Sequence, residues 1–202
     1  MGQTIPTSPL GSLYALESQI RECFGRVVYS HKTHEKCGDI ALSRLSHIKL
    51  WQLVLSAVTT GGLIAVVFGD ASQSKVAGGI SALVSTALLA LNAYTKDVDP
   101  GQTAQKHKMA ADQLWVIREA YLSLLTDIRS DDISVDSVRA RRDQLQSELA
   151  AAYSAAPRTS SAGYARASKA LKVNEDLTFS DSEIDQFLPT PLRRSQSLPP
   201  AV

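Results

Sequence analysis

The sequence has few of the residues from which cross-linked or metal-stabilised folds are built. Among 202 residues there are two cysteines, Cys23 and Cys37, and no C-x-x-C pattern joins them. This excludes a disulfide framework or a cysteine zinc site as the basis of the fold. An excess of charge of one sign is also missing, because 21 basic and 20 acidic residues leave a formal net charge of +1. We therefore expect no direct binding of nucleic acid, which calls for clustered Lys and Arg.

The sequence also lacks the motifs that mark catalytic and cofactor sites. It contains no G-x-S-x-G, Walker A or H-E-x-x-H motif and no paired acidic cleft, so we expect neither enzymatic activity nor a cofactor. The N-terminus has no charged region followed by an apolar run, which argues against a secretory signal. Pro6 stands where a myristoylation site requires Ser or Thr, so we expect no lipid anchor there.

A possible metal site near the N-terminus is weak. His31, His34 and Cys37 step by three, with Glu35 close by, and His34 and Cys37 already belong to an apolar stripe. Packing within a helix interface is the preferred interpretation and metal binding the alternative, so we expect no metal ion. His107 is isolated and followed by a lysine, which favours a solvated face.

Two long apolar runs occupy the middle of the chain. Leu50–Gly69 and Val76–Thr95 each hold 20 residues without Asp, Glu, Lys, Arg or His. As helices they are roughly 30 Å long, which matches the hydrocarbon core of a bilayer. The break between them, "DASQSK", predicts a short turn in which Asp70 and Ser72 cap the second helix. A buried soluble hairpin needs a larger protein around it, so a membrane hairpin is favoured.

The cations around the runs predict an orientation. Four lie in residues 30–49 and three in residues 96–115, whereas Lys75 is alone at the hairpin tip. The positive-inside rule then places both termini in the cytoplasm and the hairpin tip outside. Trp51 and Tyr94 lie at the same cytoplasmic level, as in an aromatic belt.

The remaining chain predicts helices and no strands, giving an all-α membrane protein with a two-helix hairpin on a cytoplasmic helical bundle. We expect cytoplasmic helices at about 12–48, 102–129, 134–156 and 161–172, within one domain of residues 11–174. Heptad-like apolar stripes run along 13–41 and 110–128, and Pro100-Gly101 marks a joint. Residues 1–10 read as a flexible N-terminus, 175–188 as a short helical segment capped by Ser180 and Glu183, and 189–202 as a disordered tail.

Small residues recur at four-residue steps in both spans and predict close packing of helix backbones. They pack either within one hairpin or between protomers. The predicted packing positions are Ala57, Gly61, Ala65 and Gly69 in the first span and Gly78, Ala82 and Ala90 in the second.

Polar residues of the second span recur on one side of the helix. Two interpretations stay open: hydrogen bonding between packed helices, or the lining of an ion path in an oligomer. Because two spans cannot enclose a path alone, the second interpretation requires a homo-oligomer. Its expected lining is Ser81, Ser85, Leu88, Asn92 and Lys96, with Leu88 as a narrow apolar step.

The join between the hairpin and the next helix resembles the SLATT family. The resemblance rests on "WQLVLSAVTTGG" and "QKHKMAADQLWVIREAYLSLLTDI", and "LTFSDSEIDQFLP" is similar to the end of one subgroup. It covers roughly residues 10–190. The residues of this sequence that match the family motif include His107, Trp115, Arg118, Glu119, Tyr121 and Asp127.

This resemblance implies a membrane effector of bacterial anti-phage defence. Such two-transmembrane domains accompany signalling nucleotidyltransferases and nucleotide-sensing domains, and they are thought to form pores that depolarise or damage the inner membrane, halting growth as abortive infection. The implied partners are the membrane, further copies of the chain, and an associated nucleotidyltransferase or its nucleotide product. The alternative is a membrane-tethered scaffold that recruits a partner through its cytoplasmic helices.

Overall fold

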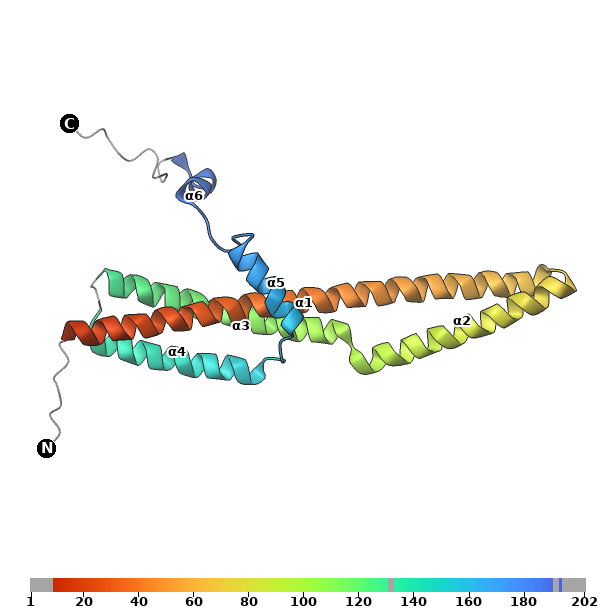
Figure 1. The fold of residues 1–202 in the computed structure, drawn as a ribbon, viewed down its shortest axis with the longest axis horizontal. Coiled ribbons are helices and arrows are strands. Elements are labelled where there is room, and N and C mark those ends of the chain that lie inside the picture. Colours follow the sequence, from red (N-terminus) through yellow and green to blue (C-terminus); the bar gives the residue numbers. More distant parts are fainter. Residues whose placement is uncertain (1–8, 131–132, 191–192, 194–202) are drawn as a thin grey trace.

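The computed structural model describes residues 9–130, 133–190 and 193, and the elements in this part of the chain are α-helices (Figure 1). In chain order they are α1 (Pro9–Phe68), α2 (Ala71–Val98), α3 (Pro100–Arg129), α4 (Val135–Ala155), α5 (Ser161–Lys172) and α6 (Asp181–Phe187). The predicted all-α class with a two-helix apolar hairpin is thereby confirmed. Most of the expected flexible N-terminus and disordered tail lies outside the described residues, so those two predictions stay predictions.

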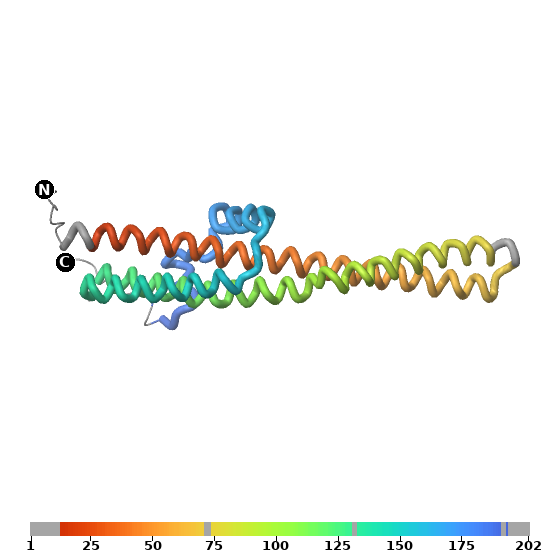
Figure 2. Tube along the Cα trace, turned by 90° about the horizontal axis from the view of Figure 1, so that it is seen from below, coloured from red at the N-terminus to blue at the C-terminus, as the bar shows by residue number. Residues whose placement is uncertain are grey.

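α1 is one continuous helix of 60 residues, about 90 Å long. The sequence suggested a base helix at about 12–48 and a separate span at 50–69, but the structure has no break between them. Residues 39–60 contain neither proline nor glycine, so nothing interrupts the backbone hydrogen bonds there. The same helix therefore belongs to the base at its N-terminal end and to the hairpin at its C-terminal end (Figure 2).

The turn at the hairpin tip is shorter than expected. Only Gly69 and Asp70 separate α1 from α2, whereas the sequence suggested a six-residue break. Asp70 holds the N-cap position with an extended backbone, but its side chain makes no capping hydrogen bond, so that part of the prediction is wrong. The Ser74 hydroxyl instead donates to the carbonyl oxygens of Gly69 and Asp70 at 3.1 and 2.9 Å. A Cβ at Gly69 would collide with the carbonyl oxygen of Ala65, so a residue without a side chain suits this turn.

The joint between hairpin and base is at Asp99. Its φ of 30° is left-handed, and it ends α2 and begins α3 at the same residue. Proline disfavours a helical conformation in the residue before it, and Pro100 follows directly. The Asp99 carboxylate accepts a hydrogen bond from the Gln102 backbone N–H at 2.9 Å, which caps α3. The predicted Pro100-Gly101 joint therefore lies one residue earlier than the sequence suggested.

The base is a bundle of the N-terminal half of α1 with α3 and α4. Its core consists of side chains that recur at heptad-like spacing, as the stripes of the sequence indicate. Fully buried members include Ile20 and Val27 of α1, Leu114 and Tyr121 of α3, and Leu145 of α4. The core does not extend into the hairpin, so the hairpin projects from the base as a separate arm (Figure 1).

The C-terminal segment packs across the middle of α1. Ser160 caps α5 by accepting from the Gly163 N–H at 3.1 Å, and a Cβ at Gly163 would collide with the Cys37 sulfur, so α5 lies very close to α1. Beyond α5, Lys32 of α1 forms an ion pair with Asp176 at 2.9 Å. The predicted capping box at Ser180 is present at the start of α6.

Candidate functional site in the hairpin and the adjoining base

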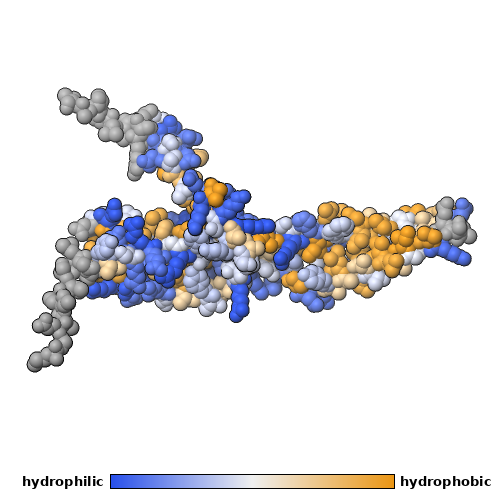
Figure 3. Space-filling view, viewed as in Figure 1, coloured by the Kyte–Doolittle hydropathy of each residue, from blue (hydrophilic) through white to orange (hydrophobic). Residues whose placement is uncertain are grey.

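The outer surface of the hairpin is apolar and uncovered. Both candidate membrane spans are long and apolar enough to cross a bilayer, and 0% and 6% of their apolar segments are buried within the chain. Leu53, Val67, Leu83 and Leu89 are each at least 69% exposed. Figure 3 shows the apolar surface gathered over the hairpin, with the hydrophilic surface over the base. A buried soluble hairpin does not fit this surface, whereas a bilayer covers it.

α1 and α2 meet along a seam with heptad spacing. The half-buried or buried positions of the hairpin recur at steps of three and four on each helix, and apart from the half-buried Ala77 the described positions between them are exposed. On α1 these seam positions are Gln52, Leu55, Thr59, Gly62 and Val66; on α2 they are Ser74, Gly78, Ser81, Val84, Leu88, Leu91 and Thr95.

The closest approach in the seam is between Gly62 and Ser81. Ser81 is 4% exposed, and a Cβ at Gly62 would collide with its hydroxyl oxygen. The Ser81 hydroxyl has no hydrogen-bond partner among the described residues. Gly78 also belongs to this contact, because a Cβ there would lie 3.6 Å from the Val66 side chain. Small residues thus bring the two helices together, as in membrane helix pairs.

A side-chain hydrogen bond crosses the seam near the base. The Gln52 amide donates to the Asn92 carbonyl oxygen at 2.8 Å. A polar pair of this kind avoids an unsatisfied amide at the membrane boundary. The bond agrees with the interpretation in which polar residues of the spans bond to each other.

The predicted pore-lining residues do not share one environment. Ser81 and Leu88 lie on the seam, whereas Ser85, Asn92 and Lys96 are exposed. The predicted packing positions divide as well. Gly78 lies in the seam, and the exposed positions are Ala57, Gly61, Ala65, Gly69, Ala82 and Ala90. It therefore stays a prediction that the first group lines an ion path. It also stays a prediction that the exposed packing positions form contacts between copies of the chain.

Three histidines lie buried between α1 and α3 in the base. His31, His34 and His107 are 3–5% exposed, so the expectation of a solvated face for His107 is wrong. The Nδ1 atoms of His34 and His107 are 3.0 Å apart, and one must carry the proton that the other accepts. The described residues contain no group of three or more metal-binding side chains.

Burial keeps these histidines neutral. Desolvation, followed by the charges of His107 and His31, lowers the pKa of His34 to about 4. Desolvation also lowers the pKa of His107 and of His31. A neutral pair with one protonated Nδ1 is consistent with the observed hydrogen bond, whereas two imidazolium rings would repel each other.

The residues that match the family motif lie along α3, and two of them, Trp115 and Arg118, lie beside His31. Trp115 packs against His31 with ring centroids 5.6 Å apart, and the Arg118 guanidinium lies 3.8 Å above the Trp115 ring. Arg118 Nε also donates to Glu119 at 2.9 Å. Tyr121 lies in the core, where burial raises its pKa to about 12, and Asp127 is exposed. Most of the motif thus stabilises the α1–α3 interface.

The His34–His107 contact could not be predicted, because the two residues are 73 positions apart and the periodicity of one helix does not identify its partner. Only the position of His107 three residues before the α3 stripe at Ala110 indicates that it faces the core.

Residues 16–183 match the model of the SMODS and SLOG-associating 2TM effector domain family 4. No curated protein and no solved structure matches the chain. The match includes the hairpin, the histidine cluster, α5 and the start of α6.

Proposed function

Because the chain belongs to the SMODS and SLOG-associating 2TM effector domain family 4, we propose that it oligomerises into a pore that depolarises or permeabilises the bacterial inner membrane during anti-phage defence. Membership makes it a two-span effector associated with nucleotide-signalling systems. The pore, and arrested growth as its consequence, are the steps that we add.

The observation that carries the proposal is the uncovered apolar surface of the hairpin. Only 0% of the apolar segment of the first span and 6% of that of the second are buried within the chain. One hairpin inserted in a bilayer satisfies that surface but encloses no water, because its own seam is filled by side chains. Several copies in a ring are needed for an aqueous path. The exposed small residues Ala57, Gly61 and Ala65 supply a surface on which neighbouring hairpins pack closely.

In the proposed orientation both termini are cytoplasmic. The flanking cations lie on the base side of the hairpin, and Lys75 with Asp70 occupies the tip. Trp51 and Tyr94 are 59% and 57% exposed at the base end of the two spans, where aromatic rings suit the lipid interface.

We propose that the described arrangement is the resting state. Ser81 and Leu88 face α1, so they reach a pore only after α2 turns relative to α1, with Ser85, Asn92 and Lys96 then completing the lining. The joint at Asp99 is where such a turn would occur. A partner nucleotidyltransferase or its nucleotide product would trigger opening only through a difference in affinity between the two states.

The experiment measures membrane potential with a voltage-sensitive dye in bacteria that express the chain. Leu88→Ser places a hydroxyl at the apolar step and should depolarise cells without a trigger, because dewetting no longer closes the path. Leu89→Ser is the control, since Leu89 is 70% exposed toward lipid and should leave the potential unchanged. Asn92→Leu should reduce triggered depolarisation. If all three variants insert and assemble and behave like the parent, this face of α2 is packing and the pore proposal fails.

A scaffold function has its own supporting observation. Phe179 and Phe187, beside and within α6, are 65% and 81% exposed, which suits capture of a protein partner. If the chain only tethers a partner, Phe187→Ser should abolish the phenotype in cells, and purified protein in liposomes should conduct no ions under any condition.

A further inference from the structure

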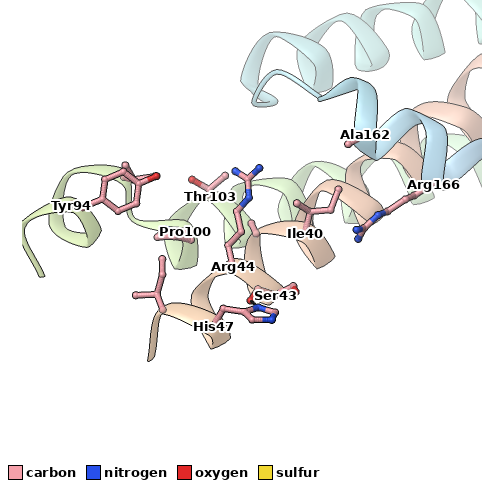
Figure 4. Close-up of a pocket in the computed structure, with 12 residues that line it drawn as sticks. Ile40, Ser43, Arg44, His47, Tyr94, Pro100, Thr103, Ala162 and Arg166 are labelled. Atoms are coloured by element: carbon pink, nitrogen blue, oxygen red, sulfur yellow. Dashed lines mark hydrogen bonds between the residues drawn. The ribbon is translucent and has the colours of Figure 1, made fainter. Parts of the chain in front are cut away.

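A hollow of about 760 Å³ lies where the hairpin leaves the base. It lies between the middle of α1, the end of α2, the start of α3 and the start of α5, beside the Asp99 joint (Figure 4). Its 12 lining residues include three basic side chains, Arg44, His47 and Arg166, and no acidic one. A hollow lined by basic side chains without an acidic one attracts an anion.

The two arginines have no partner in the part of the chain that the structure describes. Among the described residues, neither Arg44 nor Arg166 has an ion pair or a side-chain hydrogen bond. Arg26 and Arg118, in contrast, pair with glutamates at 2.6 and 2.5 Å. The guanidinium donors at the hollow are therefore available to a ligand, and their planar geometry suits phosphate.

The close-up shows how these groups are placed. Arg44 extends from α1 toward Thr103 of α3, whereas Arg166 comes from α5 on the other side of Ile40 (Figure 4). The Thr103 hydroxyl already donates to Asp99 but keeps lone pairs, and Ser43 adds a second hydroxyl to the lining. A ligand in the hollow thus meets two guanidinium groups from different helices and at least one hydroxyl.

The other side of the hollow is apolar and faces the hairpin. Ile48, Tyr94 and Val98 line it, and Tyr94 belongs to the aromatic pair at the end of the spans. The arginines line the same hollow as these residues, at the base end of the spans, and the exposed apolar surface gathers over the hairpin (Figure 3). Basic pockets at the cytoplasmic ends of spans bind anionic headgroups in this way.

We propose that this hollow is a binding site for a phosphate-bearing anion, held by Arg44 and Arg166. The position of the hollow favours the headgroup of an anionic phospholipid, and a soluble nucleotide carries the same phosphate chemistry. The bound group would contact α1, α5 and both helices of the joint at once, and would therefore brace the hairpin against the base. The site does not depend on the proposed pore.

The test uses native mass spectrometry on the full chain in a neutral detergent. Dioleoyl phosphatidylglycerol, dioleoyl phosphatidylcholine and AMP are titrated separately. We expect phosphatidylglycerol to bind more tightly than phosphatidylcholine, and Arg44→Gln with Arg166→Gln to weaken that binding roughly tenfold, because hydrogen bonds to charged groups are lost. Arg44→Lys with Arg166→Lys keeps the charge but lacks the paired guanidinium donors. Its affinity for phosphatidylglycerol should lie between that of the parent and that of the double glutamine variant.

The control is Arg129→Gln with Arg139→Gln, which removes the same charge from exposed positions at the far end of the base, where Arg139 pairs with Asp136 at 3.2 Å. It should bind like the parent. If AMP binds in place of phosphatidylglycerol and loses affinity only in the Arg44 and Arg166 variants, the site stands and its phosphate comes from a nucleotide. Equal binding of all three probes, or equal weakening in the control, overturns the proposal. Conduction is not read in this experiment, so its result is separate from that of the pore.

Discussion

Gly61 and Gly62 are neighbours in sequence, yet their surroundings in the hairpin differ. A Cβ at Gly62 would collide with the Ser81 hydroxyl, whereas a Cβ at Gly61 has nothing within 4 Å. We expect Gly62→Val to destabilise the folded hairpin by about 1–3 kcal/mol, because overpacking forces the helices apart. Gly61→Val should leave the stability of the monomer within about 0.5 kcal/mol of the parent. Thermal unfolding in detergent, followed by circular dichroism, measures both.

A second substitution tests whether the Ser81 contact is the cause. Ser81→Ala removes the hydroxyl oxygen that a new Cβ would meet, so it should recover part of the stability lost in Gly62→Val. No recovery would place the cause elsewhere in the seam.

The buried histidines make the base sensitive to acid. The folded-state pKa of His34 is about 4, below the ordinary value of 6.5, so the unfolded chain binds more protons between these values. Stability should therefore be complete above pH 6.5 and fall as the pH drops toward 4, by on the order of 3 kcal/mol for His34 alone. Urea unfolding at several pH values measures this slope. His34→Gln with His107→Gln should flatten it, and an unchanged slope in that variant would assign it to other groups.

At the scale of elements, the joint between α2 and α3 depends on Asp99 twice. Its left-handed φ of 30° and its cap on Gln102 are both features that asparagine reproduces and alanine does not. We expect Asp99→Ala to cost about 1–2 kcal/mol in the base and Asp99→Asn to cost less than half of that. Hydrogen exchange at the Gln102 and Thr103 amides measures the local loss. Equal protection in both variants would contradict the role of the cap.

Periodicity predicted the faces of the helices but not their partners. The stripe from Ala110 to Ile128 is buried throughout, because one residue in each turn of three or four must face a core. The same logic could not show that Gly62, rather than Gly61, faces α2, since both fit a small-residue pattern. That choice depends on how α1 and α2 are rotated about their own axes, which the periodicity of each helix alone does not give.

At the scale of the whole molecule, the topology has a direct test. In a background without Cys23 and Cys37, a cysteine at Asp70 should react with a membrane-impermeant maleimide added outside intact cells, and one at Ser137 should not. Both positions are exposed in the structure, so access through the membrane is the only difference expected. Labelling of Ser137→Cys alone would invert the proposed orientation.

Composition predicted the apolar spans, because 20 residues without a formal charge leave few alternatives to a bilayer. It did not predict the continuity of α1, since the change from polar to apolar residues near Lys49 resembles a boundary although the backbone has no reason to break. Nor did it predict the hollow at Arg44 and Arg166. Those residues lie 122 positions apart, in two helices that approach each other closely at Gly163 and Cys37.

The base and the hairpin tip are connected twice, once by the unbroken α1 and once by α3 and α2, and the two connections differ in stiffness. A helix of about 90 Å resists bending and twisting along its length, so it acts as a strut that fixes the distance from the far end of the base to the hairpin tip. The return route through α3 and α2 contains a pivot at Asp99. Torque applied to the base should therefore reach the membrane as a swing of α2 around a nearly stationary α1, and a staple that immobilises that pivot should leave the strut intact while blocking the swing.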